Sequence, residues 1–386
     1  MEIQTKQKIF TRDFTLGFFA TLTFFSAHHI LIPTLPIYLS KLGSKEAEIG
    51  ILIGVFGVSS LAFRPFIGRA LLKNPEKNIM IAGTLLFAFT AIAYFVAQPF
   101  WPFLMVRFIQ GIGFAFYSTA SLTFIANISQ AAHLGESLSY FLLATNLSLA
   151  LAPVLGVFLI NHFGFNLLFL VCLGLSLSSL FITNKLGRRD IVPSEGPSPG
   201  IDSFLCRKAL SPSIISSFMH IIWGALSAFF PLYAINQGIA NPGFFFTAIA
   251  IMLILGRTLG GRILDLYSRE RVILYSLTLL VISMGILSFS KTQPMFLLVA
   301  VTWGIGHAFI VPSVLAYTLD RAGSPRGPAI GTYTAIGDFG VVLGPMIMGI
   351  IIRLTSYRMM FFFLALICFI NLNYFYFFVR EKKGTF

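Results

Sequence analysis

The stretch RPFIGRALLK, Arg64 to Lys73, follows a long apolar run and returns in part in the second half of the chain. There the chain reads RTLGGRILD, Arg257 to Asp265, again after an apolar run. The arginines of the two copies align at one constant offset, but Leu72 stands where the second copy has Asp265. A basic stretch that recurs with constant spacing predicts a chain built from two repeats.

Other short segments match between the two halves in the same order. The matching pairs are Gly111–Phe116 with Gly304–Phe309, Asn146–Gly156 with Asp338–Gly349, and Pro36–Gly43 with Pro231–Gly238. Between the halves, Leu186 to Leu210 is the longest polar interruption and is rich in Pro and Gly, as linkers are. We therefore predict an N-terminal unit at 1–185, a linker at 186–210 and a C-terminal unit at 211–386.

The composition indicates an integral membrane protein. Of the 386 residues, 56% are hydrophobic and only 11% are charged, whereas a soluble domain carries about 25% charged residues. A helix needs roughly 20 apolar residues to cross a hydrocarbon core of about 30 Å. The chain contains twelve such runs, and so we predict an all-α protein with twelve transmembrane helices at 14–40, 48–71, 79–98, 100–128, 138–161, 164–184, 211–236, 243–264, 271–290, 295–319, 328–352 and 357–379.

The net charge of +13 comes from basic residues placed as orientation signals. Most of the 27 Lys and Arg residues fall on one side of the membrane if the N-terminus is cytoplasmic, so we expect both termini inside. This placement argues against a nucleic-acid partner. The three cysteines match no metal or redox spacing, and no catalytic motif occurs, so we expect no metal, no cofactor and no enzymatic activity. We also expect a monomer.

Ionisable residues inside apolar segments are informative, because a charge at the bilayer centre costs at least about 2.5–3.5 kcal/mol. Asp338 is the one carboxylate that we place well inside such a segment, and burial would let it load and release a proton. Arg107 is always charged. It would bind an anionic substrate group, respond to the protonation of Asp338, or satisfy backbone carbonyls of the first helix. The predicted proton-coupling residues are Asp338, Arg107, His220 and His307.

The two repeats, the basic stretches and several motifs resemble the major facilitator superfamily, and most of all its bacterial twelve-helix drug/proton antiporter branch. Arg107, Gln110 and Gly111 match the family's Arg-x-x-Gln-Gly motif. Gly340, Gly344, Pro345 and Gly349 fit the proline-glycine motif in the eleventh segment, whereas small residues replace its glycines around Pro153. The basic motif lacks its acid at Leu72 and its second glycine at Pro75.

The resemblance implies two pseudo-symmetric six-helix bundles around a central cavity lined by helices one, four, seven and ten. His28, Arg107, His220 and His307 fall on these four helices, one on each. It also implies that helices five and eleven each cross a helix of the other half, that the protein lies in the bacterial cytoplasmic membrane, and that basic residues form a latch. We predict gating roles for Arg64, Gly68, Arg69, Pro153, Arg257, Gly261, Arg262, Asp265 and Pro345.

The function predicted from these observations is alternating-access export of a small amphiphilic or hydrophobic compound in exchange for protons. Its partners would be the substrate, protons and membrane lipids. Substrate binding is predicted for His28, Gln110, Phe114, Asn146, Trp223, Trp303 and Tyr333. Two alternatives stay open, namely proton-coupled uptake of a sugar or organic anion, and translocation of a lipid-like molecule.

Overall fold

The computed structural model describes residues 10–71, 73–129, 134–187, 206–259, 267–322 and 326–380, which are almost entirely helical. The first half contains α1 (Arg12–His29), α2 (Leu31–Lys41), α3 (Glu46–Leu71), α4 (Glu76–Ala93), α5 (Trp101–Ile128), α6 (Leu134–His162) and α7 (Gly164–Asn184). The second half contains α8 (Arg207–Asn236), α9 (Gly243–Leu259), α11 (Arg269–Leu287), α12 (Gln293–Ala322), α13 (Arg326–Leu354), α14 (Tyr357–Tyr374) and a short π-helical turn, η3 (Phe375–Val379).

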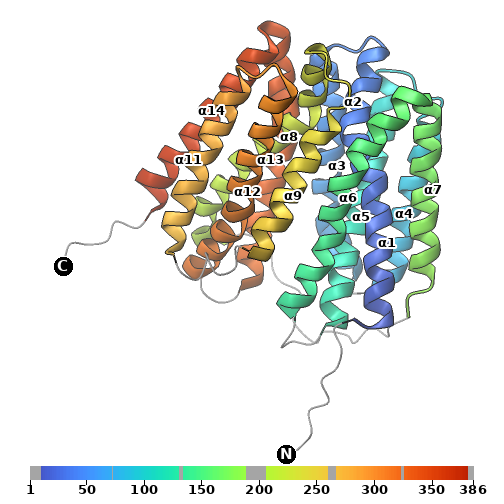
Figure 1. Ribbon diagram of the computed structural model, residues 1–386. Helices are drawn as coiled ribbons and strands as arrows, with labels where there is room; N and C mark the ends of the chain where they lie inside the picture. Colours follow the sequence, from blue (N-terminus) through green and yellow to red (C-terminus); the bar gives the residue numbers. More distant parts are fainter. Residues whose placement is uncertain are drawn as a thin grey trace, which may run out of the picture.

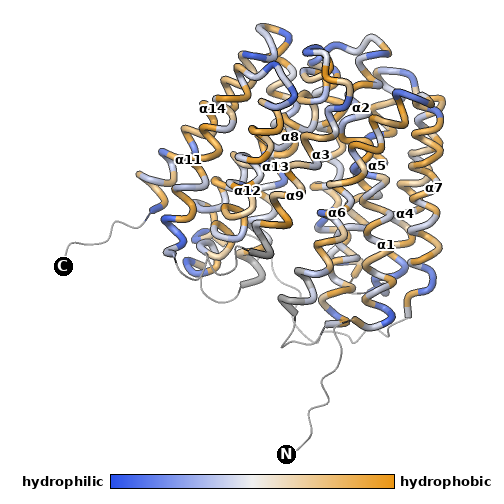
Figure 2. The backbone as a smooth tube through the Cα atoms, in the orientation of Figure 1, coloured by the Kyte–Doolittle hydropathy of each residue, from blue (hydrophilic) through white to orange (hydrophobic). Residues whose placement is uncertain are grey.

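The twelve predicted segments correspond to these helices. Eleven spans in the described part of the chain are long and apolar enough to cross a membrane, and α9 supplies a shorter apolar helix. α1 and α2 form one span with a break at Ile30. Pro33 causes part of this break, because it lacks the N–H that would bond to the carbonyl of His29. Figure 2 shows hydrophobic residues along the helices and hydrophilic residues mostly toward their ends. The chain is therefore an all-α, multi-pass membrane protein.

The helices form two bundles with a common lower end in Figure 1, where α1 begins and η3 ends. We call this the termini end and the opposite side the far end. In the first bundle α4 packs on α5 and α7, and α1 packs on α6 and α7. In the second, α8 packs on α13, and α11 packs on α12 and α14. The unit boundaries at 185 and 211 stay a prediction, since residues 188–205 lie outside the described ranges.

The α3–α13 and α6–α9 pairs make the most extensive contacts between the bundles, and α2 also packs on α8. The α6–α9 pair closes the far end through hydrogen bonds to main-chain carbonyls. Asn161 Nδ2 donates to Ala240 at 3.0 Å, Asn241 Nδ2 donates to Val154 at 3.2 Å, and Thr247 Oγ1 donates to Ala150. Helices five and eleven of the predicted order, α6 and α13, thus each contact a helix of the other half.

Small residues let the two backbones of the α3–α13 pair approach closely. A Cβ atom added at Gly50 would collide with the carbonyl oxygen of Pro345, and one added at Gly57 would lie 2.8 Å from Val342 Cγ2. Near the far end, a Cβ atom at Gly349 would lie 2.7 Å from the carbonyl oxygen of Glu46. Pro153 makes the same kind of contact on α6, where Gly243 of α9 packs against its backbone.

Replacing Gly50 by Ala should destabilise the protein, because the added methyl group meets the backbone of Pro345 rather than a side chain that can move. Overpacking of this kind costs about 1–3 kcal/mol, and thermal unfolding in detergent should show a lower melting temperature. Gly174→Ala on α7 is the matched control, because nothing lies within 4 Å of its added Cβ. Equal melting temperatures for the two variants would contradict the close approach.

Candidate functional site

A cavity of about 350 Å³ lies between the bundles, on the termini side of their far-end contacts. Residues from α1, α3, α5 and α6 line one side, and residues from α8, α9, α12 and α13 line the other. A smaller cavity of about 90 Å³ adjoins it toward α2 and shares His28, Phe56 and Trp223 with it. The site is thus built from both halves, so a rearrangement of the bundles would change its shape.

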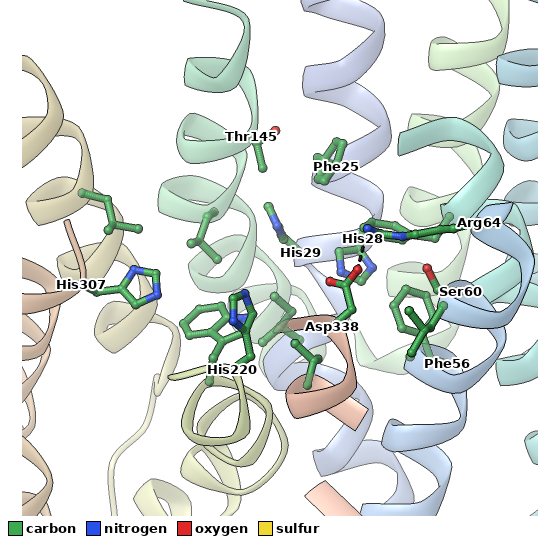
Figure 3. A pocket seen from close by; sticks show the side chains of 18 of the residues that line it. Phe25, His28, His29, Phe56, Ser60, Arg64, Thr145, His220, His307 and Asp338 are labelled. Atoms are coloured by element: carbon green, nitrogen blue, oxygen red, sulfur yellow. Dashed lines mark ion pairs between the residues drawn. The ribbon is translucent and has the colours of Figure 1, made fainter. Parts of the chain in front are cut away.

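An ion pair crosses the larger cavity. Nη1 of Arg64, on α3, lies 2.5 Å from Oδ2 of Asp338, on α13 (Figure 3). The side chains are 34% and 26% exposed, so both charges remain accessible from the cavity. Arg64 Nε is buried and has no hydrogen-bond partner in the described chain. The pair therefore links the two bundles. Each of its two side chains is also accessible enough to bind a different partner instead.

Local helix geometry places these two side chains together. α3 stays helical through Pro65 as far as Leu71, so Arg64 lies within the helix and not in a turn. Gly57 lies two turns before Arg64, and Asp338 lies one turn before Val342, which packs on Gly57. On its other side, α13 approaches α8 closely, because Gly340 packs against the carbonyl oxygen of Ser217. Glycines on both helices thus allow an arginine and a carboxylate from different bundles to meet.

Four histidines line the same cavity: His28, His29, His220 and His307. Nδ1 of His220 lies 2.7 Å from the carbonyl oxygen of Ser216 and must donate to it, so Nε2 is the acceptor in the neutral ring. His29 bonds through Nδ1 to Ser148 Oγ of α6. Nδ1 of His28 is buried without a partner in the described chain. Among the described residues, no group of three or more His, Cys, Asp or Glu could hold a metal ion.

Aromatic rings form opposing walls. On the first bundle, Phe114 lies 5.2 Å from Phe56 and 4.7 Å from His28, between ring centroids. On the second bundle, Trp303 stacks between Trp223, at 5.6 Å, and His307, at 4.5 Å. Figure 3 shows His220 and His307 on one side of Asp338 and Phe56, Ser60 and Arg64 on the other. An apolar or aromatic molecule fits between such walls.

Arg107 is buried away from the ion pair and bound within its own bundle. Its Nε donates to the carbonyl of Leu52 at 3.0 Å, Nη2 donates to that of Ile53 at 3.3 Å, and Nη1 donates to Gln110 Oε1 at 2.6 Å. Tyr94 O–H donates to the same Gln110 oxygen at 2.6 Å. Of the three roles considered for Arg107, backbone satisfaction matches these contacts, with the carbonyls of α3 in place of those of the first helix. Arg107 lines only the smaller cavity.

Seven predicted binding and coupling residues line the larger cavity: His28, Phe114, His220, Trp223, Trp303, His307 and Asp338. Gln110, Asn146 and Tyr333 are buried but are not part of its lining. Asn146 follows Thr145, which does line the cavity, and successive helix residues point about 100° apart. The O–H of Tyr333 instead lies 3.5 Å from the carbonyl of Val311.

Arg64 was predicted as a gating residue of a basic latch and not as a cavity residue. The signal was available, since Arg64 falls inside the apolar segment predicted at 48–71. His29, Phe25, Phe56, Ser60 and Thr145 also line the cavity and were not predicted site residues. Their helix faces could not be assigned from apolar segments that lack a strong amphipathic pattern.

The remaining predicted gating residues stay untested. Gly68 and Arg69 lie in the last turns of α3, and nothing packs within 4 Å of a Cβ atom at Gly68. Arg257 lies in α9, but its side chain falls outside the described structure, and so do Gly261, Arg262 and Asp265. The gating roles of Pro153 and Pro345, at the contacts between the bundles, remain a prediction.

Comparison with known proteins places this arrangement in a family. The Major Facilitator Superfamily model matches residues 16–322 and 213–385, which together cover nearly the whole chain. The chain belongs to the Major Facilitator Superfamily. It is therefore a membrane transporter of small molecules and not an enzyme.

The relatives include two proteins of Staphylococcus aureus. The staphylopine export protein is 26% identical over 366 residues, which cover 88% of this chain and 89% of the relative. The quinolone resistance protein NorA is 24% identical over 336 residues, covering 83% and 84%. The fold is similar to that of the nucleoside transporter NupG, with a TM-score of 0.81 at 14% identity over 96% of this chain and all of the other. The human organic anion transporter MFSD10 gives a TM-score of 0.71 at 16% identity, covering 94% and 98%.

Replacing Gln110 by Leu should lower the melting temperature, because Arg107 and the Tyr94 hydroxyl then lose a shared acceptor in a buried site. A buried donor left unsatisfied costs about 1–3 kcal/mol, and more when it is charged. Gln110→Glu keeps an acceptor and should restore most of the stability. Thermal unfolding of both variants in detergent measures the effect. Equal stability of the Leu and Glu variants would contradict the need for this acceptor.

Proposed function

We propose that this transporter exports a small amphiphilic compound in exchange for protons. The observation that carries the proposal is the Arg64–Asp338 ion pair, which joins the two bundles inside their shared cavity. Asp338 is the titratable member, because an arginine stays protonated at any physiological pH. Protonation of Asp338 removes the charge that holds Arg64, so proton binding acts directly on a contact between the bundles.

Such a contact can couple proton binding to alternating access. A ligand shifts a conformational equilibrium only as far as its affinity differs between the two states. Arg64 and Asp338 belong to helices of different bundles, so the energy of their pair depends on how the bundles are placed. The proton therefore binds the two conformations of the transporter with different affinities. Asp338 serves as the coupling residue, and His220 and His307 face the same cavity as proton relays.

The direction of transport is inferred from the relatives, and the substrate class from the cavity walls. Two relatives that match most of the chain are named for export or drug resistance. The stacked Trp223 and Trp303 face a cavity that also holds Phe25, Phe56 and Phe114. Large aromatic walls with few charged groups bind a molecule mainly through surface contact. A small amphiphile is the substrate that suits both observations.

Proton-coupled uptake of an organic anion is the second candidate. It is favoured by the charge of the two cavities, where Arg64, Arg107 and four histidines face a single carboxylate, Asp338. An anion that took Arg64 from Asp338 would leave the carboxylate to bind a proton, so anion and proton would travel together. In uptake the proton would move in the same direction as the substrate, whereas in exchange it would move in the opposite direction. The direction of proton movement therefore distinguishes the two candidates.

The test uses proteoliposomes that contain a pH indicator. The probe is the naphthalene derivative that raises the melting temperature most, chosen from a panel of neutral, cationic, anionic and zwitterionic forms. Exchange predicts that probe entry makes the lumen more alkaline, whereas uptake with a proton makes it more acidic. The Asp338→Asn variant should show no probe-dependent proton movement, because its side chain cannot titrate.

Asp320→Asn is the matched control, because Asp320 also pairs with an arginine, Arg269, but does so within the second bundle and outside the cavity. This variant should keep normal proton movement. Normal coupling in Asp338→Asn would remove Asp338 from the mechanism and overturn the proposal.

A further inference from the structure

The Arg64–Asp338 pair limits which charged molecules can bind beside it. Both side chains face the cavity and neutralise each other at 2.5 Å. A ligand that takes one partner leaves the other partly buried and without its counter-ion in a largely apolar site, which is unfavourable. The charge of the ligand therefore decides which residue loses its partner.

The three types of charged ligand have different consequences. A cation that binds Asp338 leaves Arg64 unpaired, and Arg64 cannot lose its proton to become neutral. An anion that binds Arg64 leaves Asp338 unpaired unless the carboxylate takes up a proton. A molecule with both charges can pair with Arg64 and Asp338 at once, so neither group is left alone.

We propose that the transported molecule is a zwitterion, with a carboxylate that binds Arg64 and an ammonium that binds Asp338, on an apolar or aromatic frame. This inference rests on the proposed exchange of substrate for protons and names its substrate class. The ammonium and the proton compete for Asp338, and this competition is what exchange requires. A purely anionic substrate would instead promote protonation of Asp338 and travel with the proton.

Other polar groups of the cavity suit the carboxylate end of such a molecule. Arg64 Nε and the indole Nε1 of Trp303 are buried donors without acceptors in the described chain. Trp303 is fully buried, and its ring lines the cavity beside His307. Besides the ion pair, the titratable groups that line the cavities are His28, His29, His220, His307 and Arg107, none of which adds a negative charge. The cavities thus hold several positively charged or donor groups and one anion, Asp338, that can bind an ammonium.

The frame of the molecule is accommodated by the aromatic walls. Trp223 and Trp303 lie nearly parallel at 23°, on the second bundle. Phe56 and Phe114 face the cavity from the first bundle. A bicyclic aromatic group suits this space, because ring stacking and edge contacts add to the burial of apolar area.

The experiment compares four probes that share one ring and differ only in charge. They are 2-naphthylalanine, its methyl ester, its N-acetyl derivative and its N-acetyl amide, which are zwitterionic, cationic, anionic and neutral. Binding to the purified full-length protein is measured by calorimetry in two buffers of different ionisation enthalpy, which also counts protons. We expect the zwitterion to bind about tenfold or more tighter than either singly charged form, without proton uptake.

Variants assign each charge to its partner. In Arg64→Gln the zwitterion should lose its advantage over the cationic ester, and in Asp338→Asn it should lose its advantage over the anionic N-acetyl form. The neutral amide reports whether each variant still folds and keeps its cavity. Asp320→Asn should keep the wild-type order of affinities, because its ion pair lies outside the cavity. An ester or N-acetyl derivative that binds the wild-type protein as tightly as the zwitterion would overturn the inference.

The two proposals can fail separately. Exchange of the cationic ester for protons, without zwitterion preference, would leave the proposed function standing and refute the zwitterion. A clear zwitterion preference without any probe-driven proton movement would refute proton exchange and leave the binding inference standing.

Discussion

The ion pair between Arg64 and Asp338 is the constraint on which the site depends. It joins helices of different bundles at 2.5 Å, inside a cavity where apolar and aromatic surfaces surround both charges. Its existence depends on the glycines that bring α3 and α13 into contact, since a bulkier residue at Gly57 would meet Val342. Close packing of two backbones and the pairing of two charges are therefore parts of one arrangement.

Arg64 and Arg107 of the first bundle differ in how firmly they are held. Arg107 donates to two main-chain carbonyls and to Gln110, all in its own bundle, so a rearrangement of the bundles need not break these bonds. Arg64 depends on Asp338 of the other bundle and has a buried Nε without a partner in the described structure. A movement of one bundle against the other would therefore change the contact of Arg64 but not those of Arg107.

Hydropathy and repeats could predict the twelve crossings, because the cost of placing polar backbone and charges in lipid leaves few alternatives. Because a charge in lipid is also costly, a carboxylate inside an apolar segment is unusual, and this singled out Asp338 as a candidate proton-binding group. Side-chain direction could not be predicted, because apolar segments have no polar face to fix their rotation. For example, Gln110 accepts a hydrogen bond from Arg107 and does not line the larger cavity, although Phe114, one turn later on the same helix, does.

Arg64 illustrates a different limit of sequence reasoning. A basic residue near the end of an apolar segment serves orientation in the membrane whether it lies in a loop or in the helix. Counting charges cannot separate these cases, and the partner of Arg64 lies on a helix far along the chain. Only the placement of α13 against α3 reveals that the same arginine also neutralises a carboxylate in the cavity.

The repeat adds an asymmetry between the α3–α13 and α6–α9 contacts, the two most extensive contacts between the bundles. Asn146 is the counterpart of Asp338, so the α6–α9 contact lacks a carboxylate at the equivalent position. Its described polar contacts are neutral hydrogen bonds, such as that from Asn161 to Ala240. Neutral amides do not titrate, so proton binding leaves this contact unchanged. Under the proposed coupling, a proton on Asp338 would weaken the α3–α13 contact and leave the α6–α9 hydrogen bonds as they are, so the two pseudo-symmetric contacts would respond unequally to pH.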